Sequence, residues 1–446
     1  MYACLLWRKV LFLLCYAFDL VGFNMDIVDL KKRAMDIVES QRDRLIVISH
    51  QIHEFNEIGY EEFKSSALLA GELTKAGFRV EKLVAGLETA FSASWGSGKP
   101  VIGLLGEYDA LPELGHACGH NLMGTAVVGA GIALRKIVSE KGLKGTVKVF
   151  GCPCEEGFKE GAGGKILMLE AGVFDGLDVS MMVHACFGKY GVWSKARARE
   201  HLVVRFTGRR PTVSEKNYDI VNALDSAVIM LNGVSVLKQR KRPESVITYI
   251  ISEGGVNPNI VPLNATVRLY IRSLDTEYLA ELVKKVEDVA NGAAAMTGAK
   301  VEIKKHTPTY AASIPNLTLT RLYQGNLLEL VADVEEPFVS AKRFTSGESA
   351  SSTDYGNVSR VIPSETVNIS LGPPTISLHT KQATAATKTP EADKALMTGV
   401  KTLAMTGIDF LLNPKLVREA QDELKSYREK GYEHPYPKGN YPKYLQ

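Results

Sequence analysis

The fold is decided by a stretch that reads PVIGLLGEYDALPELGHACGHN from Pro100 to Asn121. Residues 100–105 are apolar on both faces, which is typical of a strand in a sheet covered by helices on both sides. The small residues from Asn121 to Val138 predict a helix, and Gly145 to Gly151 predicts a second buried strand. Strand, helix and strand in this order favour an α/β fold.

The same alternation extends outward in both directions. Apolar positions at helical spacing predict helices over 27–48, 65–76, 316–331 and 391–412, with further strands over 78–83, 89–95 and 366–371. Composition changes near Lys195, after which strands are predicted over 199–207, 246–253 and 265–272 and helices over 218–238 and 276–297. This second group forms a compact α+β unit, so we expect one α/β domain interrupted by a smaller inserted domain.

The length supports two domains, because 446 residues are too many for one ordinary core. We place the first part of the larger domain at 25–196, the inserted domain at 197–308 and the second part of the larger domain at 309–446. Residues 1–24 are set apart as an extension or signal-like segment.

Charge and cysteine content exclude some classes of function. Lysine and arginine number 53 against 50 aspartates and glutamates, and the basic residues are scattered, so we expect no nucleic-acid partner. The chain has six cysteines, and a disulfide framework is not expected in a chain this long. A reducing compartment, the cytoplasm, is the expected location.

The first residues leave an alternative open. Residues 5–18 are apolar except for Arg8, Lys9 and Cys15, which suits a signal peptide or signal anchor. The apolar run after Lys9 is short for a membrane span, and no clear cleavage site follows it. The other interpretation is an upstream extension, with translation starting at Met25. If the segment acts as a signal, the protein is secretory or membrane-anchored.

Two groups of polar residues follow the first buried strand. Glu107 and Asp109 come directly after it, where α/β proteins place their sites. Cys118 and His120 open the next helix, around Gly119, which lets the backbone fold closely. A thiolate and an imidazole two residues apart suit zinc or another borderline metal.

The second buried strand ends in the adjacent carboxylates Glu155 and Glu156. Two like charges there raise each other's pKa, and a metal resolves the conflict if one glutamate ligates and the other takes a proton from water. A solvated loop pair is the plainer interpretation. For Cys152 and Cys154, which flank Pro153, packing roles are expected.

Two histidines follow apolar runs further along the chain. His184 follows Val183 and His379 follows Leu378, so each is predicted at the end of a strand. A single histidine there is more often a structural residue, and these two gain weight only from the pattern as a whole.

Together these segments resemble a metallopeptidase family that includes aminoacylase, carboxypeptidase G and the indole-acetyl-amino-acid amidohydrolases. The resemblance spans about Leu45 to Pro414. It is carried by GEYDALP at 106–112, GHACGHN at 115–121, PCEEG at 153–157, STDYGNVS at 352–359 and LHT at 378–380. Within the family the chain is most similar to the branch with aminobenzoyl-glutamate hydrolases and β-alanyl-lysine or Xaa-Arg dipeptidases.

The resemblance implies a di-metal hydrolase that cleaves the amide bond of a dipeptide or an N-acyl amino acid. Glu155 would be the general acid and base, and Asp109 a carboxylate that supports a ligand. In other branches a histidine ligand stands at the position of Glu107, and His116 is not expected to be a ligand. The ligands of the two divalent ions, zinc or manganese, would be Cys118, His120, Glu156, His184 and His379.

The inserted domain matches the family's lid, which also pairs with a second subunit, so a homodimer is expected. Within it, Asn259 and Arg272 resemble groups that hold the substrate's carboxylate, a task suited to the guanidinium fork.

One position departs from the family pattern. The lid of this branch normally carries a histidine that reaches across the dimer to stabilise the oxyanion, and here the segment from Phe206 ends at that position in Thr212. Loss of such a donor typically lowers turnover by about 10² to 10³; Arg210 could substitute in part. The alternative hypothesis is therefore a catalytically impaired metal-binding relative with a binding or regulatory role.

Overall fold

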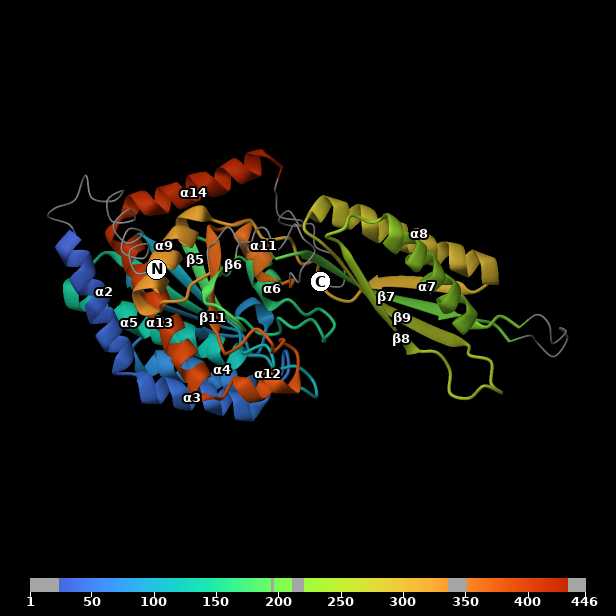
Figure 1. Cartoon of the computed structure of the whole chain (residues 1–446), viewed down its shortest axis with the longest axis horizontal. Coiled ribbons are helices and arrows are strands. Elements are labelled where there is room, and N and C mark those ends of the chain that lie inside the picture. Colours follow the sequence, from blue (N-terminus) through green and yellow to red (C-terminus); the bar gives the residue numbers. More distant parts are fainter. Residues whose placement is uncertain (1–23, 194–195, 211–219, 336–350, 432–446) are drawn as a thin grey trace.

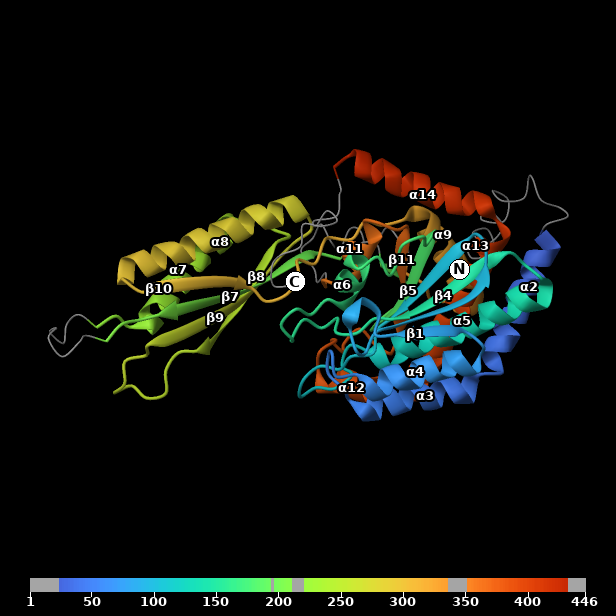
Figure 2. The same cartoon turned by 180° about the vertical axis from the view of Figure 1, so that it is seen from behind.

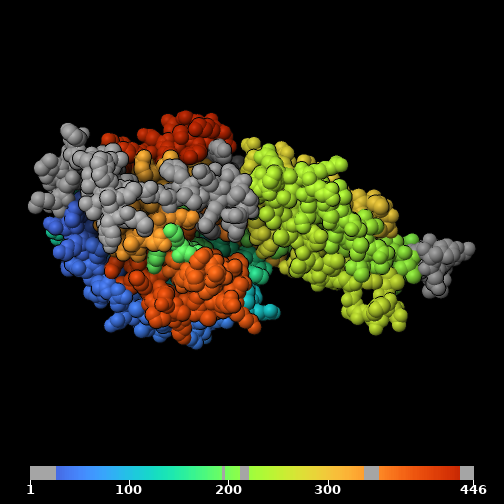
Figure 3. All heavy atoms as spheres, in the orientation of Figure 1, coloured from blue at the N-terminus to red at the C-terminus, as the bar shows by residue number. Residues whose placement is uncertain are grey.

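The protein has two lobes in the computed structural model, which describes residues 24–193, 196–210, 220–335 and 351–431. We call them the large domain and the small domain. The small domain stands out to one side of the large one (Figures 1 and 3). Segments from both ends of the chain build the large domain, and a middle segment builds the small one. This confirms the predicted α/β architecture with an insertion. The limits 25–196, 197–308 and 309–446 stay a prediction.

A seven-stranded mixed sheet forms the centre of the large domain. Its order is β1 (Arg79–Lys82), β2 (Phe91–Ser97), β4 (Gly145–Gly151), β3 (Val101–Gly106), β5 (Val179–Cys186), β11 (Ser364–Ser370) and β6 (Gly191–Trp193). The four strands β4, β3, β5 and β11 run parallel, and the outer strands pair antiparallel to them. The parallel strands are the apolar ones, because both their faces are covered.

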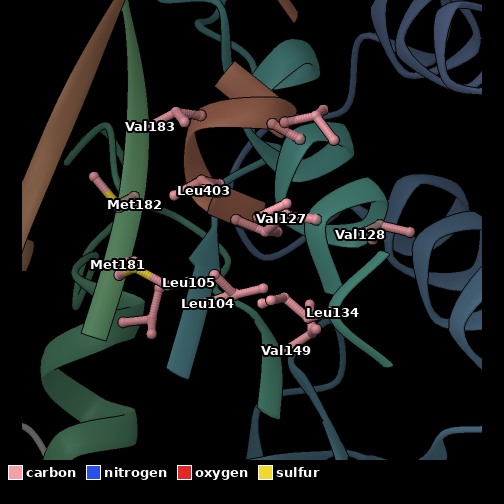
Figure 4. Close-up of a cluster of buried hydrophobic side chains, with 14 of the residues drawn as sticks. Leu104, Leu105, Val127, Val128, Leu134, Val149, Met181, Met182, Val183 and Leu403 are labelled. Atoms are coloured by element: carbon pink, nitrogen blue, oxygen red, sulfur yellow. The ribbon is translucent and has the colours of Figure 1, made fainter. Parts of the chain in front are cut away.

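Two long helices, α5 (His120–Lys141) and α13 (Pro390–Leu412), form the layer directly against one face of this sheet. Their apolar side chains meet those of β3, β4 and β5 in the core drawn in Figure 4. Both helices are long and apolar enough to cross a membrane, but 78% and 89% of their most apolar windows are buried inside the protein. Their apolar character is therefore explained by core packing.

Further helices surround the large domain (Figure 2). They are α2 (Asn24–Glu39), α3 (Arg42–Phe55), α4 (Phe63–Lys75), η1 (Val84–Gly86), α6 (Gly164–Glu170), α9 (Leu317–Leu330), α11 (Tyr355–Ser359), α12 (Lys381–Ala386) and α14 (Pro414–Glu429). The prediction of one helix over 27–48 was wrong, since two helices meet there. The side chains of Ser40 and Gln41 both donate to the carbonyl of Ile37, at 2.6 and 3.2 Å, and so compete with the helical bonds.

The small domain is a four-stranded antiparallel sheet with two helices on one face. The strand order is β10 (Lys300–Lys305), β7 (Ala198–Thr207), β9 (Asn264–Ser273) and β8 (Val246–Glu253), and the helices are α7 (Ala223–Arg240) and α8 (Thr276–Thr297). α8 has the predicted limits. α7 begins at Ala223 rather than at 218, because the side chain of Asn222 accepts a hydrogen bond from the amide of Leu224 and caps the helix there.

Gly106, at the end of β3, fixes how closely α5 approaches the sheet. A Cβ at this position would lie 2.4 Å from Cγ2 of Val127 and 3.0 Å from Cα of Gly124. We expect Gly106→Ala to lower the free energy of unfolding by about 1–3 kcal/mol through overpacking, measured by urea denaturation. Gly71→Ala is the control, because a Cβ on Gly71 of α4 meets nothing within 4 Å; equal losses in both variants would contradict the prediction.

Candidate active site

The candidate site lies at the edge of the sheet where the parallel strands end. Glu107 and Asp109 follow β3, Glu155 and Glu156 follow β4, and His184 is two residues from the end of β5. Because β3, β4 and β5 run parallel, their carboxyl ends meet at this edge. The fold thus brings together residues that are up to 77 positions apart in the chain (184 − 107).

Gly119 places the motif at the start of α5 against β5. Its φ of 78° lies in the left-handed region, and a Cβ there would be 2.4 Å from Cβ of Ala185. Only glycine permits this approach, which brings Sγ of Cys118 to 3.7 Å from Nε2 of His184.

His120 is fully buried among carboxylates. Its Nδ1 is 2.9 Å from Oδ1 of Asp109, and its Nε2 is 3.1 Å from Oε2 of Glu107 and 3.9 Å from Oε1 of Glu156. Burial lowers the pKa of His120, but Asp109, Cys118 and Glu107 outweigh burial and raise it well above its usual range. Asp109 also accepts the amide of Glu156 at 3.1 Å, so it orients two residues of the site.

His379 reaches the same place from a different kind of segment than predicted. It lies in a loop before α12, not at the end of a strand, and its φ of 62° is left-handed. Its amide donates to the carbonyl of Ala117 at 3.1 Å, which ties this loop to the Cys118 segment. Nε2 of His379 lies 3.7 Å from Oε2 of Glu156, and its side chain is 53% exposed at the mouth of the site.

The donor atoms lie in three groups that could each hold a metal ion, with all atoms in a group within 4.8 Å of one another. The groups are Cys118, His120 and His184; Cys118, Glu156 and His379; and Glu107, His120 and Glu155. The five residues that the resemblance implies as ligands fall within the first two groups. Cys118 belongs to both, as a ligand shared by two ions would.

The chemistry of the donors fits bound cations. Within the described residues, Nε2 of His120 and Oε1 of Glu156 are buried without a hydrogen-bond partner. Burial raises the pKa of the Cys118 thiol far above its usual range, so only a nearby cation would make it a thiolate. Burial, with Asp109 and Glu107 adding to it and His120 opposing it, raises the pKa of Glu156 to about 7. A thiolate, imidazoles and a carboxylate suit zinc and similar divalent ions.

Glu155 is buried beside these groups, at 7% exposure. Burial raises its pKa well above the usual range, and the charges of Glu107, Asp354 and Glu156 add to the effect. Its backbone carbonyl accepts a hydrogen bond from the hydroxyl of Tyr310 at 2.7 Å. A carboxyl group with a raised pKa in a fixed position suits proton transfer near neutral pH.

One charged group of the site was missed by sequence reasoning. Lys165 on α6 is completely buried, with its ammonium 2.5 Å from Oδ1 of Asp354 and in an ion pair with Glu107. Asp354 also accepts the amide of Lys165 at 2.9 Å. The signal that could have revealed Lys165 is a lone lysine at the start of the apolar run Ile166 to Leu169.

The remaining predicted residues lie apart from the donor groups. His116 is buried with Nε2 3.0 Å from the carbonyl of Ile52 and belongs to none of the three groups, as expected for a residue that is not a ligand. Thr212 falls in the segment 211–219, outside the described residues, so the altered oxyanion position stays a prediction. Cys152 and Cys154 are buried free thiols, in agreement with packing roles.

Asn259 and Arg272 are not brought together within one chain. Asn259 lies in the exposed connection before Asn264, where β9 begins, whereas Arg272 is at the other end of β9. Eight residues of strand separate Asn264 from Arg272 (272 − 264), which is roughly 26 Å. One substrate carboxylate therefore cannot touch both residues of the same chain in this arrangement.

Fold and site together define the class of metal-dependent hydrolases, with donor groups for two ions beside a buried carboxyl group. The sequence from 103 to 406 matches the model of peptidase family M20/M25/M40. The chain belongs to this family.

Individual relatives agree with this assignment. A mouse (Mus musculus) Xaa-Arg dipeptidase is 35% identical over 89% of this chain and 92% of its own length. One of the polypeptides of the p-aminobenzoyl-glutamate hydrolase of Escherichia coli K12 is 31% identical over 92% and 98%. Two solved structures share the fold. An aminobenzoyl-glutamate utilization protein from Klebsiella pneumoniae has a TM-score of 0.61 at 16% identity and covers 85% of this chain and 99% of its own. A dinuclear metal-binding M20 peptidase from Bacillus subtilis has a TM-score of 0.55 at 19% identity, with 82% and 99% covered.

Proposed function

We propose that this protein hydrolyses the amide bond of a dipeptide or an N-acyl amino acid with the help of two divalent metal ions, zinc or manganese. The observation that carries the proposal is the pair of donor groups sharing Cys118, next to the buried Glu155. The names of the two relatives, a dipeptidase and an aminobenzoyl-glutamate hydrolase, support this substrate class.

The ions would be held by Cys118, His120, Glu156, His184 and His379. When bound, they would activate a water molecule and polarise the amide carbonyl. Glu155 takes the proton of that water and returns it to the leaving nitrogen. Asp109 keeps His120 oriented through Nδ1, at 2.9 Å, so that Nε2 points to the other donors.

We further propose that the small domain joins two subunits and that each subunit completes the other's site. The separation of Asn259 from Arg272 supports this, because the partner's copy of the exposed loop could supply the missing amide. We also propose a cytoplasmic location, in agreement with four unpaired cysteines among the described residues.

The proposal is tested with the purified protein loaded with zinc or manganese and a panel of β-alanyl, alanyl and N-acyl derivatives of lysine, arginine and glutamate. We expect turnover on at least one substrate class. Absence of turnover on the whole panel, with two ions bound per chain by metal analysis, would refute the proposal.

Metal dependence gives a separate prediction. Chelation should abolish turnover and lower the melting temperature, because ions that bind only the folded state stabilise it, and added zinc or manganese should restore both. Cys118→Ala should reduce the bound metal, since Cys118 belongs to two donor groups. Cys186→Ala is the matched control, because Cys186 is a free thiol outside these groups. If both variants retain the same metal content, Cys118 is not a ligand.

The second candidate function is a metal-binding relative that has lost its activity, motivated by Thr212. Thr212→His restores the family's donor, which is typically worth about 10² to 10³ in turnover. If the starting protein is inactive and the variant turns substrate over, the binding or regulatory role is favoured. We expect activity in the starting protein, measured on the same panel.

A further inference from the structure

The face of the small-domain sheet that is turned away from α7 and α8 carries a group of arginines without carboxylate partners. Alternate residues of β7 and β9, among them Leu202 and Leu269, form the domain's core. Arg199 and Arg272 point to the opposite face, and the register of β7 and β9 sets them directly across from each other. Arg197 lies two residues before Arg199 and so on the same face.

Two like charges directly opposite each other destabilise a sheet unless something neutralises them. Among the described residues no ion pair joins Arg197, Arg199 or Arg272 to a carboxylate. Nε and Nη2 of both Arg197 and Arg199 are buried without a hydrogen-bond partner, in side chains only 3% and 5% exposed. Arg272 is partly exposed, and burial together with the charges of Arg199 and Arg197 lowers its pKa to about 10. Unpaired buried guanidinium groups are costly, and an anionic ligand would satisfy them.

Two tyrosines connect these arginines to the candidate active site. The guanidinium of Arg199 lies over the ring of Tyr310, 3.7 Å from its centroid, while Arg199 and Arg272 both lie over Tyr270, at 5.0 and 4.8 Å. The hydroxyl of Tyr310 donates to the carbonyl of Glu155, and that of Tyr270 to the carbonyl of Gly157, at 2.7 and 3.4 Å. A ligand on these arginines therefore lies beside the segment that carries Glu155 and Glu156.

We infer that Arg197, Arg199 and Arg272 bind two carboxylates of one substrate, so that the amino acid released by hydrolysis is acidic, such as glutamate or aspartate. The inference rests on the proposed function, in which Arg272 holds the carboxylate next to the scissile amide. Residues directly opposite on antiparallel strands have Cα atoms about 4.5–5.5 Å apart. The two carboxyl carbons of glutamate are joined through four C–C bonds and lie roughly 5 Å apart when extended, which matches this spacing. A lysine or arginine side chain in the same place would add a further positive charge.

The test uses the metal-loaded protein and three dipeptides that differ only in the charge of one side chain, Ala-Glu, Ala-Gln and Ala-Lys. We expect kcat/KM for Ala-Glu to exceed that for Ala-Gln by at least about tenfold, since hydrogen bonds between charged partners are the strong ones, with Ala-Lys slowest. In Arg197→Gln and Arg199→Gln the ratio of Ala-Glu to Ala-Gln should fall toward one.

Arg205→Gln is the matched control. Arg205 is on the same strand and the same face but exposed and six residues from Arg199, roughly 20 Å away; the ratio should be retained. Arg199→Gln removes a group packed between two rings and could unfold the protein, so Arg197→Gln alone is sufficient. A preference for Ala-Lys, or an unchanged ratio in folded Arg197→Gln, would overturn the inference.

A binding measurement separates this inference from the proposed function. Calorimetric titration of the metal-loaded Glu155→Gln protein with Ala-Glu and Ala-Gln reads the preference without turnover. If no dipeptide is hydrolysed but Ala-Glu binds at least about tenfold more tightly, the proposed function fails and the anion site stands. If hydrolysis occurs and binding shows no preference for Ala-Glu, the anion site fails and the proposed function stands.

Discussion

Glu155→Gln is expected to remove nearly all turnover while the fold and the bound metal remain. Glutamine matches the size of glutamate but cannot take a proton from water or return it to the leaving nitrogen. General acid and base catalysis by one side chain contributes about 10² to 10⁴ in rate, so a loss of this size in kcat is expected, with little change in KM. Steady-state kinetics on the best dipeptide of the panel provide the measurement.

Two controls make this result specific. Glu160→Gln alters an exposed glutamate of the same loop and should leave kcat unchanged. Glu156→Gln should act differently from Glu155→Gln, because it removes a proposed ligand and should lower the metal content. If Glu155→Gln loses metal as Glu156→Gln does, Glu155 is a ligand within the group of Glu107 and His120, and the assigned roles are wrong.

Lys165→Met is expected to cause the largest loss of stability. The ammonium of Lys165 is fully buried and holds Glu107 and Asp354 together. Without it, two buried carboxylates would face each other with no cation from α6, and breaking a buried pair on one side costs about 3–5 kcal/mol. The free energy of unfolding is measured by urea denaturation on chelated protein, so that bound metal does not compensate.

Lys189→Met is the matched control, because Lys189 pairs with Asp333 at the surface, where both side chains are more than half exposed. An exposed pair contributes about 0–1 kcal/mol. The double variant Lys165→Met with Asp354→Asn should recover part of the loss, since one of the two stranded charges is removed. Equal effects of Lys165→Met and Lys189→Met would show that the buried group contributes no more than a surface pair.

Much of the fold could be predicted from the sequence because its elements are strongly patterned. Strands β4 and β8 and helix α8 have the predicted limits, and each is a long apolar or amphipathic run between clear ends. The break between α2 and α3 could not be read, since it depends on side chains of Ser40 and Gln41 that bond back to the helix. Such local competition leaves the apolar periodicity unchanged.

The candidate site was predictable where motifs follow buried strands, and not where contacts depend on tertiary structure. Cys118, His120 and Glu156 follow or open regular elements. The loop conformation of His379 and the pairing of Lys165 with Asp354, 189 residues later, have no local signature. The same holds for Arg199 and Arg272, whose opposition is set by the register of two strands that lie far apart in sequence.

The position of β11 has a consequence for the order in which the chain folds during synthesis. This strand lies between β5 and β6, although both leave the ribosome long before it. From the end of β5 to the start of β11 there are 178 residues (364 − 186), which take about 10–35 s to synthesise. Throughout that time the apolar edge of β5 has no neighbour on that side, while the small domain can already close around its own core. The nascent large domain thus exposes an unpaired strand edge that favours chaperone binding or mispairing.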